Sequence, residues 1–204
     1  MEYSTLFITF PVKRQTLSGL LYIPKSTSSC PGVVIYHGRG SSKKRYTDRA
    51  KVLAGAGFVT LVFDFRGCGE SEGSFGGYHA ALVSEQRNVK SLMLVAPAIY
   101  KDGWWNITPE SIEETRRNIY REIDNIDSTK VFKSLEKYGG NLLIIEHEHD
   151  EIIPKHITHA YYDHTVHAIK RKLKVIKDAP HALHDEKLRN ESNKLTIDWF
   201  IETL

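Results

Sequence analysis

The sequence predicts an α/β protein with a mostly parallel, doubly wound sheet and helices on both faces. Short continuous apolar runs, such as Val33-Val34-Ile35, are typical of strands that are buried on both faces. These runs alternate with segments in which apolar residues recur at helical spacing, as in a parallel sheet with crossover helices. The loops after the predicted strands are rich in Gly, Asp and His. In such sheets, ligands bind beyond the carboxyl ends of the strands.

The first part of the chain predicts a hairpin followed by a strand–helix–strand unit. Leu6–Val12 and Leu17–Ile23 alternate apolar and polar residues around a polar turn, which indicates two antiparallel strands. Gly32–Tyr36 and Thr60–Phe65 are predicted as buried strands. Between them, apolar residues at helical spacing predict a helix from Tyr46 to Ala54, ended by glycines.

The second part continues the alternation of helices and strands after a glycine-rich loop. Its predicted elements, in order, are a helix Tyr78–Gln86, a strand Ser91–Ala96, a strand Asn141–Glu146, a helix Pro154–Ala168, a strand Leu173–Ile176 and a closing helix Lys187–Ile201. Residues 101–140 form a long polar, mostly helical segment that is expected as a cap-like insertion. The sequence has no internal repeat, and one domain spanning 1–204 is expected.

Composition and charge narrow the possible functions. The 204 residues carry a net charge of +3, from 28 basic and 25 acidic side chains, which gives no concentrated basic stripe for nucleic acid. The short basic clusters, Lys43-Lys44-Arg45 and Lys170-Arg171-Lys172, are expected to be solvated. Two isolated cysteines form no disulfide framework. With no secretory signal at the start and no apolar run of about 18 residues, a cytoplasmic protein without membrane contact is expected.

Two loops in the first half carry candidate catalytic groups. His37-Gly38-Arg39-Gly40-Ser41 directly follows a buried strand, and its small residues allow backbone N–H groups to approach a ligand oxygen. Gly73-Ser74-Phe75-Gly76 runs into a predicted helix, where a serine can be exposed on a sharp turn. The intervening Asp64–Gly73 loop lacks the spacing of a dinucleotide-binding motif. No cofactor is expected.

Two loops in the second half provide an acid and a base. Asp150 follows a buried strand, where it can orient a histidine from a neighbouring loop. His181 lies in the loop between the last strand and the closing helix. His184 is one helical turn further on and is the alternative base. A serine requires such a base to become a nucleophile.

Together these segments resemble the α/β-hydrolase superfamily, with greatest similarity to small esterases and serine-aminopeptidase-like hydrolases. The resemblance extends from the His-Gly loop through Asp-x-Arg-Gly-x-Gly-x-Ser to the closing helix, and the order Ser, Asp, His fits the superfamily. It implies Ser74 as nucleophile, His181 as general base and Asp150 as its orienting acid. It further implies oxyanion donation by Arg39 and Phe75. Trp104 and Trp105 are implied as substrate-pocket residues, with core packing as the alternative.

The sequence departs from the superfamily pattern before the nucleophile. Glu72 occupies the first glycine position of Gly-x-Ser-x-Gly, and only a few residues separate Ser71 from Ser74, where the family has a helix and a central strand. The sheet is therefore expected to contract, with Thr60–Phe65 pairing directly with Ser91–Ala96. The alternative is a sheet with open edges, which favour dimerisation or aggregation. A monomer and a homodimer both remain possible.

Two alternatives to a serine hydrolase remain open. The shortened segment before Ser74 is compatible with a hydrolase-like scaffold that has weak or no catalysis. The lesser alternative is a metal-binding hydrolase that uses His147, His149 and Asp150, since strand alternation places the two histidines on the same side. For a serine enzyme, the expected partner is a small ester-like, thioester-like or amide-like substrate.

Overall fold

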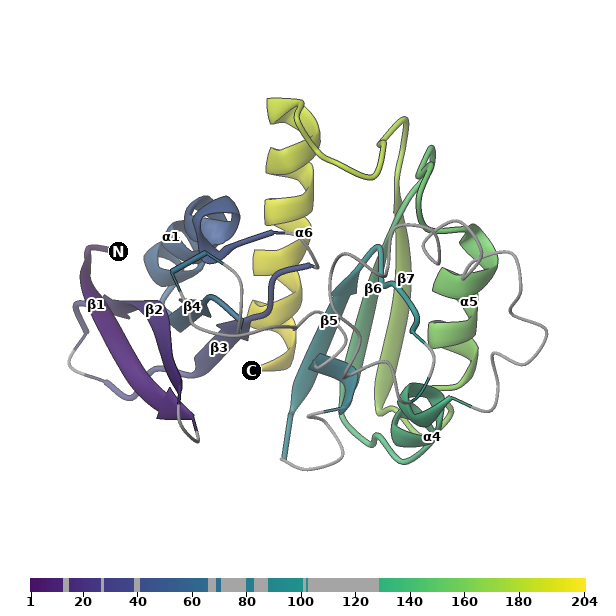
Figure 1. Ribbon diagram of the computed structural model, residues 1–204, viewed down its shortest axis with the longest axis horizontal. Coiled ribbons are helices and arrows are strands. Elements are labelled where there is room, and N and C mark those ends of the chain that lie inside the picture. Colours follow the sequence, from purple (N-terminus) through teal and green to yellow (C-terminus); the bar gives the residue numbers. More distant parts are fainter. Residues whose placement is uncertain are drawn as a thin grey trace. The chain divides into compact units, whose positions relative to one another are not determined.

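The structure is a computed structural model, and it describes residues 1–12, 15–26, 28–38, 41–65, 69–70, 80–82, 88–100, 102 and 129–204. The chain divides into two compact units, Met1–His79 and Ala80–Leu204 (Figure 1). Each unit contains its own sheet. The single-domain expectation stays a prediction.

The first unit is built on a four-stranded sheet in the order β1-β2-β4-β3. β1 (Tyr3–Val12) and β2 (Gln15–Pro24) form the predicted antiparallel hairpin, in register from Tyr3 opposite Pro24 to Val12 opposite Gln15. β4 (Val59–Phe63) pairs antiparallel with β2 and parallel with β3 (Gly32–Ile35). The crossover from β3 to β4 contains a 3-10 turn, η1 (Lys43–Tyr46), and the helix α1 (Thr47–Gly55).

The core of the first unit lies between α1 and the sheet. Ala50, Leu53 and Ala54 are fully buried on the inner face of α1. The two alanines pack with Tyr22 of β2 and Val62 of β4. Small side chains on the helix allow it to lie close to the strands, which closes the crossover over the sheet.

The second unit is built on a three-stranded parallel sheet with β6 in the middle, in the order β5-β6-β7. The strands are β5 (Ser91–Val95), β6 (Asn141–His147) and β7 (Lys170–Ile176). The helices are α4 (Lys130–Glu136), α5 (Lys155–Asp163) and α6 (Glu186–Thr203). The apolar run of β6 is buried throughout, as expected for a central strand that is covered on both faces.

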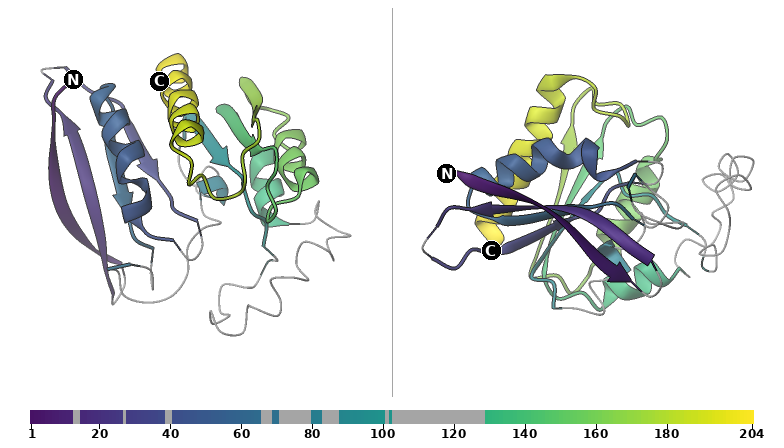
Figure 2. Two further views of the ribbon diagram at one scale, coloured as in Figure 1. Left: turned by 90° about the horizontal axis from the view of Figure 1, so that it is seen from above. Right: turned by 60° about the vertical axis from the view of Figure 1, so that its left-hand side comes forward.

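Successive side chains of β7 show that helices cover both faces of this sheet. The Lys172 ammonium lies 5.7 Å from the ring centre of Trp199 in α6, whereas the Arg171 guanidinium lies 4.6 Å from that of Tyr162, in α5. Neighbouring residues of a strand point to opposite faces, so α6 and α5 lie on opposite sides (Figure 2). The predicted α/β architecture is confirmed, with antiparallel strands at the N-terminus.

The boundaries of the predicted elements differ from those in the structure, and the difference at β7 has a physical reason. α5 ends at Asp163, and β7 begins at Lys170, three residues before the predicted start at Leu173. Among the strands that the structure describes, β7 pairs with β6 alone and lies at the edge of its sheet. Edge strands accept charged side chains, so the basic start of β7 gave no apolar signal. Lys170 and Lys172 both form ion pairs with Glu202 of α6.

The predicted pairing of Thr60–Phe65 with Ser91–Ala96 is wrong. β4 already has a strand on each side, because Gly19–Tyr22 of β2 pairs with Thr60–Phe63 and β3 pairs along the other edge. Of the predicted helix Tyr78–Gln86, the structure describes residues 80–82, which are helical. Of the expected insertion 101–140, it describes residue 102 and residues 129–140, which include α4.

Candidate active site

The loops that follow β6 and β7 are joined by hydrogen bonds in the second unit. The N–H of Glu148 donates to the carbonyl of Ile176 (3.1 Å), and the N–H of His149 donates to the carbonyl of Ala179 (2.9 Å). In return, the N–H of Asp178 donates to the Glu148 carboxylate (2.9 Å). These contacts extend the parallel pairing of β6 and β7 beyond the end of the sheet, so the two loops hold a fixed register.

This register brings Asp150 and His181 together as predicted. His181 Nδ1 lies 2.9 Å from Asp150 Oδ2 and 3.1 Å from Oδ1. The carboxylate also accepts from the N–H groups of Ile152 (2.8 Å) and Ile153 (2.7 Å). The N–H of His181 donates to the Glu151 carboxylate (3.1 Å), which fixes the histidine backbone as well.

The environment keeps Asp150 ionised and sets the tautomer of His181. Burial by itself would raise the pKa of Asp150, but the His181 imidazole and the two N–H groups outweigh it and hold the pKa below its ordinary value. An ionised carboxylate accepts the Nδ1 proton, which leaves Nε2 as the acceptor nitrogen of the ring. Asp150 is 4% exposed and His181 33% exposed, so the ring is accessible from solvent and its acid partner is not.

His147 lies buried beneath this pair, at the end of β6. Burial lowers its pKa, although the nearby Asp150 carboxylate and the carbonyls of Pro180 and His181 act in the opposite direction. Neither ring nitrogen reaches hydrogen-bonding geometry with a described residue. His147 is therefore a buried imidazole whose surroundings favour the neutral form, next to Asp150 and His181.

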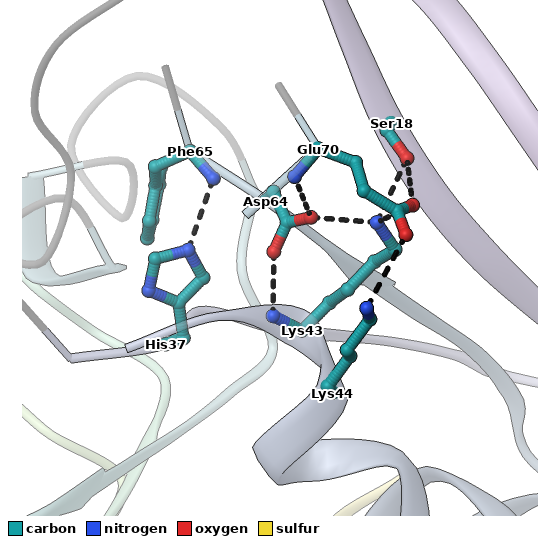
Figure 3. A network of polar contacts seen from close by, with 7 residues as sticks. All are labelled: Ser18, His37, Lys43, Lys44, Asp64, Phe65 and Glu70. Carbon is teal, nitrogen blue, oxygen red and sulfur yellow. Dashed lines mark hydrogen bonds and ion pairs between the residues drawn. The ribbon is translucent and has the colours of Figure 1, made fainter. Parts of the chain in front are cut away.

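In the first unit, Asp64 organises the loops after β3 and β4 (Figure 3). Its Oδ1 accepts from the N–H of Lys43 (2.7 Å), and its Oδ2 accepts from the N–H of Glu70 (2.9 Å) and from Lys43 Nζ (2.6 Å). Lys43 Nζ also binds Glu70 Oε2 (2.7 Å) and Ser18 Oγ (2.8 Å). These donors outweigh burial, which would raise the pKa of Asp64, and hold that pKa below its ordinary value.

His37 fixes the start of the His-Gly loop. The N–H of Phe65 donates to His37 Nε2 (3.0 Å), so the proton of the ring is on Nδ1, which lies 2.8 Å from the carbonyl of Gly38 (Figure 3). The ring is buried, and burial lowers its pKa. A turn follows in which the N–H of Ser41 donates to the carbonyl of Gly38 (3.2 Å).

The geometry at position 69 explains why one residue of the Asp-x-Arg-Gly-x-Gly segment is a glycine. Its φ of +56° lies in the left-handed region, and a Cβ at this position would be 2.4 Å from Oδ2 of Asp64. Only glycine meets both conditions. The loop therefore turns tightly enough for the following N–H, that of Glu70, to reach the Asp64 carboxylate.

The structure brings together two of the seven predicted site residues, Asp150 and His181. The acid pairs with His181, as predicted, and His184 makes other contacts: its N–H donates to the carbonyl of Ala182. The remaining predicted residues lie outside the described part of the chain: the nucleophile Ser74, the oxyanion donors Arg39 and Phe75, and the pocket residues Trp104 and Trp105.

The expectation that Lys43-Lys44-Arg45 is a solvated cluster is wrong for its first residue. Lys43 is 2% exposed, whereas Lys44 is 74% exposed. Nothing in the local sequence separates the two lysines. What distinguishes Lys43 is its buried counterion, the carboxylate of Asp64, which lies 21 residues later in the sequence.

The lesser alternative, a metal site built from His147, His149 and Asp150, is not supported, because the ligand atoms of these three side chains do not lie together. Asp150 is engaged by His181 and by backbone N–H groups, and His147 is buried away from the exposed His149. Among the described residues, one other group of metal-ligating side chains is close together. Its members, Glu148, His149 and Asp178, have ligand atoms within 4.8 Å of one another.

Sequence comparison identifies two matching families. The serine aminopeptidase family S33 matches residues 28–85, and the Uncharacterised protein family UPF0227 matches residues 68–190, more than half of the chain. No curated protein matches the chain. In the described residues, no helix is both long and apolar enough to cross a membrane.

Solved structures of several hydrolases share the fold. A dienelactone hydrolase from Anabaena variabilis aligns over the full length of both chains with a TM-score of 0.71 and 17% identity. An esterase from Pyrococcus furiosus aligns over 99% of this chain and 93% of its own, with a TM-score of 0.69 and 18% identity. A monoacylglycerol lipase from Paleococcus ferrophilus aligns over 99% of both chains, with a TM-score of 0.63 and 16% identity. At these identities the similarity establishes the fold.

Proposed function

The chain is an α/β-hydrolase and belongs to the uncharacterised protein family UPF0227, and we propose that it is a serine hydrolase of ester, thioester or amide bonds. The observation that carries this proposal is the pairing of Asp150 with His181 at the ends of two adjacent parallel strands. An ionised, buried acid that holds Nδ1 of a solvent-accessible imidazole is the arrangement that makes Nε2 a general base.

In the proposed reaction, His181 Nε2 removes the hydroxyl proton of Ser74 as its oxygen attacks the substrate carbonyl. Backbone N–H groups of Arg39 and Phe75 would stabilise the resulting oxyanion. The imidazolium then returns the proton to the leaving group, and an acyl-enzyme forms. Water, activated by the same imidazole, releases the acid and regenerates Ser74.

The anchored His-Gly loop supports this reaction from the first unit. An oxyanion site requires donors whose positions are fixed before the reaction. The N–H of Phe65 donates to His37, and the N–H of Lys43 donates to Asp64, so both ends of the segment from His37 to Lys43 are fastened to the residues after β4. Short acyl esters are the proposed substrates. We further propose a cytoplasmic protein that acts as a monomer or homodimer, with Trp104 and Trp105 at the acyl pocket.

Labelling with a fluorophosphonate tests the proposal most directly, because the probe reacts with an activated serine. The intact protein should be labelled, with the adduct on the peptide that contains Ser74. Ser74→Ala should abolish both labelling and hydrolysis of a short p-nitrophenyl ester. Ser71→Ala, three residues earlier, is the matched control and should keep both. Absence of labelling in the intact protein would favour a hydrolase-like scaffold without catalysis.

A further inference from the structure

Lys43 is a buried cation that the reaction proposed above does not use. Its side chain is 2% exposed, and its ammonium contacts two carboxylates and a hydroxyl, from Asp64, Glu70 and Ser18. Burying charges is costly, and apolar residues of similar volume often replace buried ion pairs without loss of stability. A buried ion pair at this position is therefore weak evidence of a role in stability, and the chain segments that it joins indicate a role in positioning.

The contacts of Lys43 join segments that are distant in sequence. Ser18 lies in β2, Lys43 begins the turn η1 after β3, and Asp64 follows β4 (Figure 3). Both the backbone N–H and the side-chain ammonium of Lys43 bind the Asp64 carboxylate, through different oxygens. Two bonds to one rigid group fix the direction of the chain at residue 43 as well as its position.

Lys43 ends the loop that begins at His37, after β3. Its start at His37 is held by Phe65, the residue that follows Asp64. The N–H of Phe65 donates to His37, and the His37 ring contacts the carbonyl of Gly38. The loop from His37 to Lys43 is therefore held at both ends by consecutive residues, Asp64 and Phe65. Of the two bonds from Lys43 to Asp64, the one from the ammonium can be removed by substitution without changing the backbone atoms of the loop.

We propose that Lys43 is a positioning residue, whose buried ammonium holds the His37–Lys43 loop in the conformation that presents its backbone donors to the oxyanion. The catalytic part of this inference rests on the proposed serine hydrolase function. Its structural part, the anchoring of the loop by Lys43, does not depend on that function. A misplaced donor affects the transition state more than substrate binding, so the effect falls on kcat and leaves KM nearly unchanged.

Three variants separate positioning from general stability. Lys43→Met keeps the length of the side chain and removes its charge. Lys44→Met is the matched control, because this neighbouring lysine is exposed and lies 3.5 Å from Glu70. The double variant Lys43→Met/Asp64→Asn removes both members of the buried ion pair and leaves no uncompensated charge on Asp64. It therefore remains measurable if the single variant folds poorly.

The measurements are kcat and KM for a short p-nitrophenyl ester, the thermal midpoint, and amide hydrogen exchange in peptides covering residues 37–46. We expect Lys43→Met to lower kcat by about 10- to 100-fold, with KM within about twofold. Exchange in this loop should become faster. The double variant should recover much of the thermal midpoint while kcat stays low, and Lys44→Met should resemble the unmodified protein in every measurement.

Either of two results would overturn the inference. One is unchanged loop exchange in Lys43→Met, which contradicts the anchor itself. The other is full recovery of kcat in the double variant, which shows that lost stability explained the effect. If the unmodified protein is neither labelled by a fluorophosphonate nor active, the proposed function fails, and the exchange measurement still decides whether Lys43 anchors the loop.

Discussion

At the scale of single residues, the chemistry of the candidate site depends on which histidine meets the acid. His181 binds both oxygens of Asp150 through Nδ1. The backbone N–H of His181 also donates to the Glu151 carboxylate, which holds the residue next to Asp150. His184 is close in sequence, but its N–H is engaged with Ala182. Position in the loop, rather than residue type, therefore decides which histidine contacts Asp150.

Substitutions of His181 and His184 test which of the two acts as the proposed general base. His181→Ala should lower kcat for a short ester by at least about 100-fold, the lower end of what proton transfer by a positioned base contributes. His184→Ala should retain most of the rate. Steady-state kinetics of both variants check this, and an inactive His184→Ala beside an active His181→Ala would exchange the assignments.

Gly69 combines a left-handed backbone with a close approach to the Asp64 carboxylate. Gly69→Ala should lower the free energy of unfolding by about 2–4 kcal/mol, from the left-handed backbone and from crowding against Asp64. The control is Gly32→Ala, because a Cβ at Gly32 meets nothing within 4 Å. Urea denaturation measures the free energy of unfolding of both variants. Equal small losses in the two variants would contradict the close approach of Gly69 to the carboxylate.

At the scale of secondary-structure elements, α6 illustrates how a polar segment becomes a defined helix. Asp185 precedes its first turn, and its side chain accepts from the N–H of Leu188 (3.0 Å). The helix then buries Trp199 and Phe200 towards its end. A side-chain cap supplies a partner for a backbone donor that the helix itself leaves unsatisfied.

The cap gives a prediction that is independent of catalysis. Asp185→Ala should destabilise the protein by about 1 kcal/mol, because it removes the acceptor for the Leu188 N–H. Asp185→Asn should keep most of the stability, since an amide oxygen can accept the same bond. Thermal unfolding followed by circular dichroism measures the difference. If Asn proved as destabilising as Ala, the cap would not be the cause.

At the scale of the whole molecule, buried groups from both units link stability to pH. Burial lowers the pKa values of His37 and His147, so the unfolded chain takes up protons at a higher pH than the folded chain does. Stability is then complete above the ordinary histidine pKa of about 6.5 and decreases as the pH falls below it. Asp64 and Asp150 also have lowered pKa values, and their contribution is lost at still lower pH, below about 4.

Unfolding at several pH values tests this linkage. The urea midpoint should fall between pH 7.5 and pH 5, a range in which the two histidines, and not the two aspartates, account for the change. His147→Gln removes one of these groups and should flatten the decrease. A midpoint that stays constant over this range would contradict the buried, neutral state of the histidines.

The sequence by itself determined the order of the elements and two of the chemical groups. Apolar runs predicted the strands β3, β4, β5 and β6. The expected burial on both faces is found along β6, whereas burial alternates along β4 and β5 and Val34 of β3 is exposed. The positions of Asp150 and His181 followed from the loops after two strands that become neighbours in a parallel sheet. The superfamily resemblance, carried by the order of motifs, was confirmed by the comparisons.

Tertiary structure alone decided which of these groups meet and which strands pair. The burial of Lys43 depends on a counterion 21 residues away, and the neighbours of β4 depend on the hairpin reaching one of its edges. The sequence did not indicate that β7 begins at Lys170, because the lysines of an edge strand can form ion pairs with a helix that comes later in the chain. In each case the deciding partner is distant in sequence, so no local pattern of apolar or charged residues can reveal it.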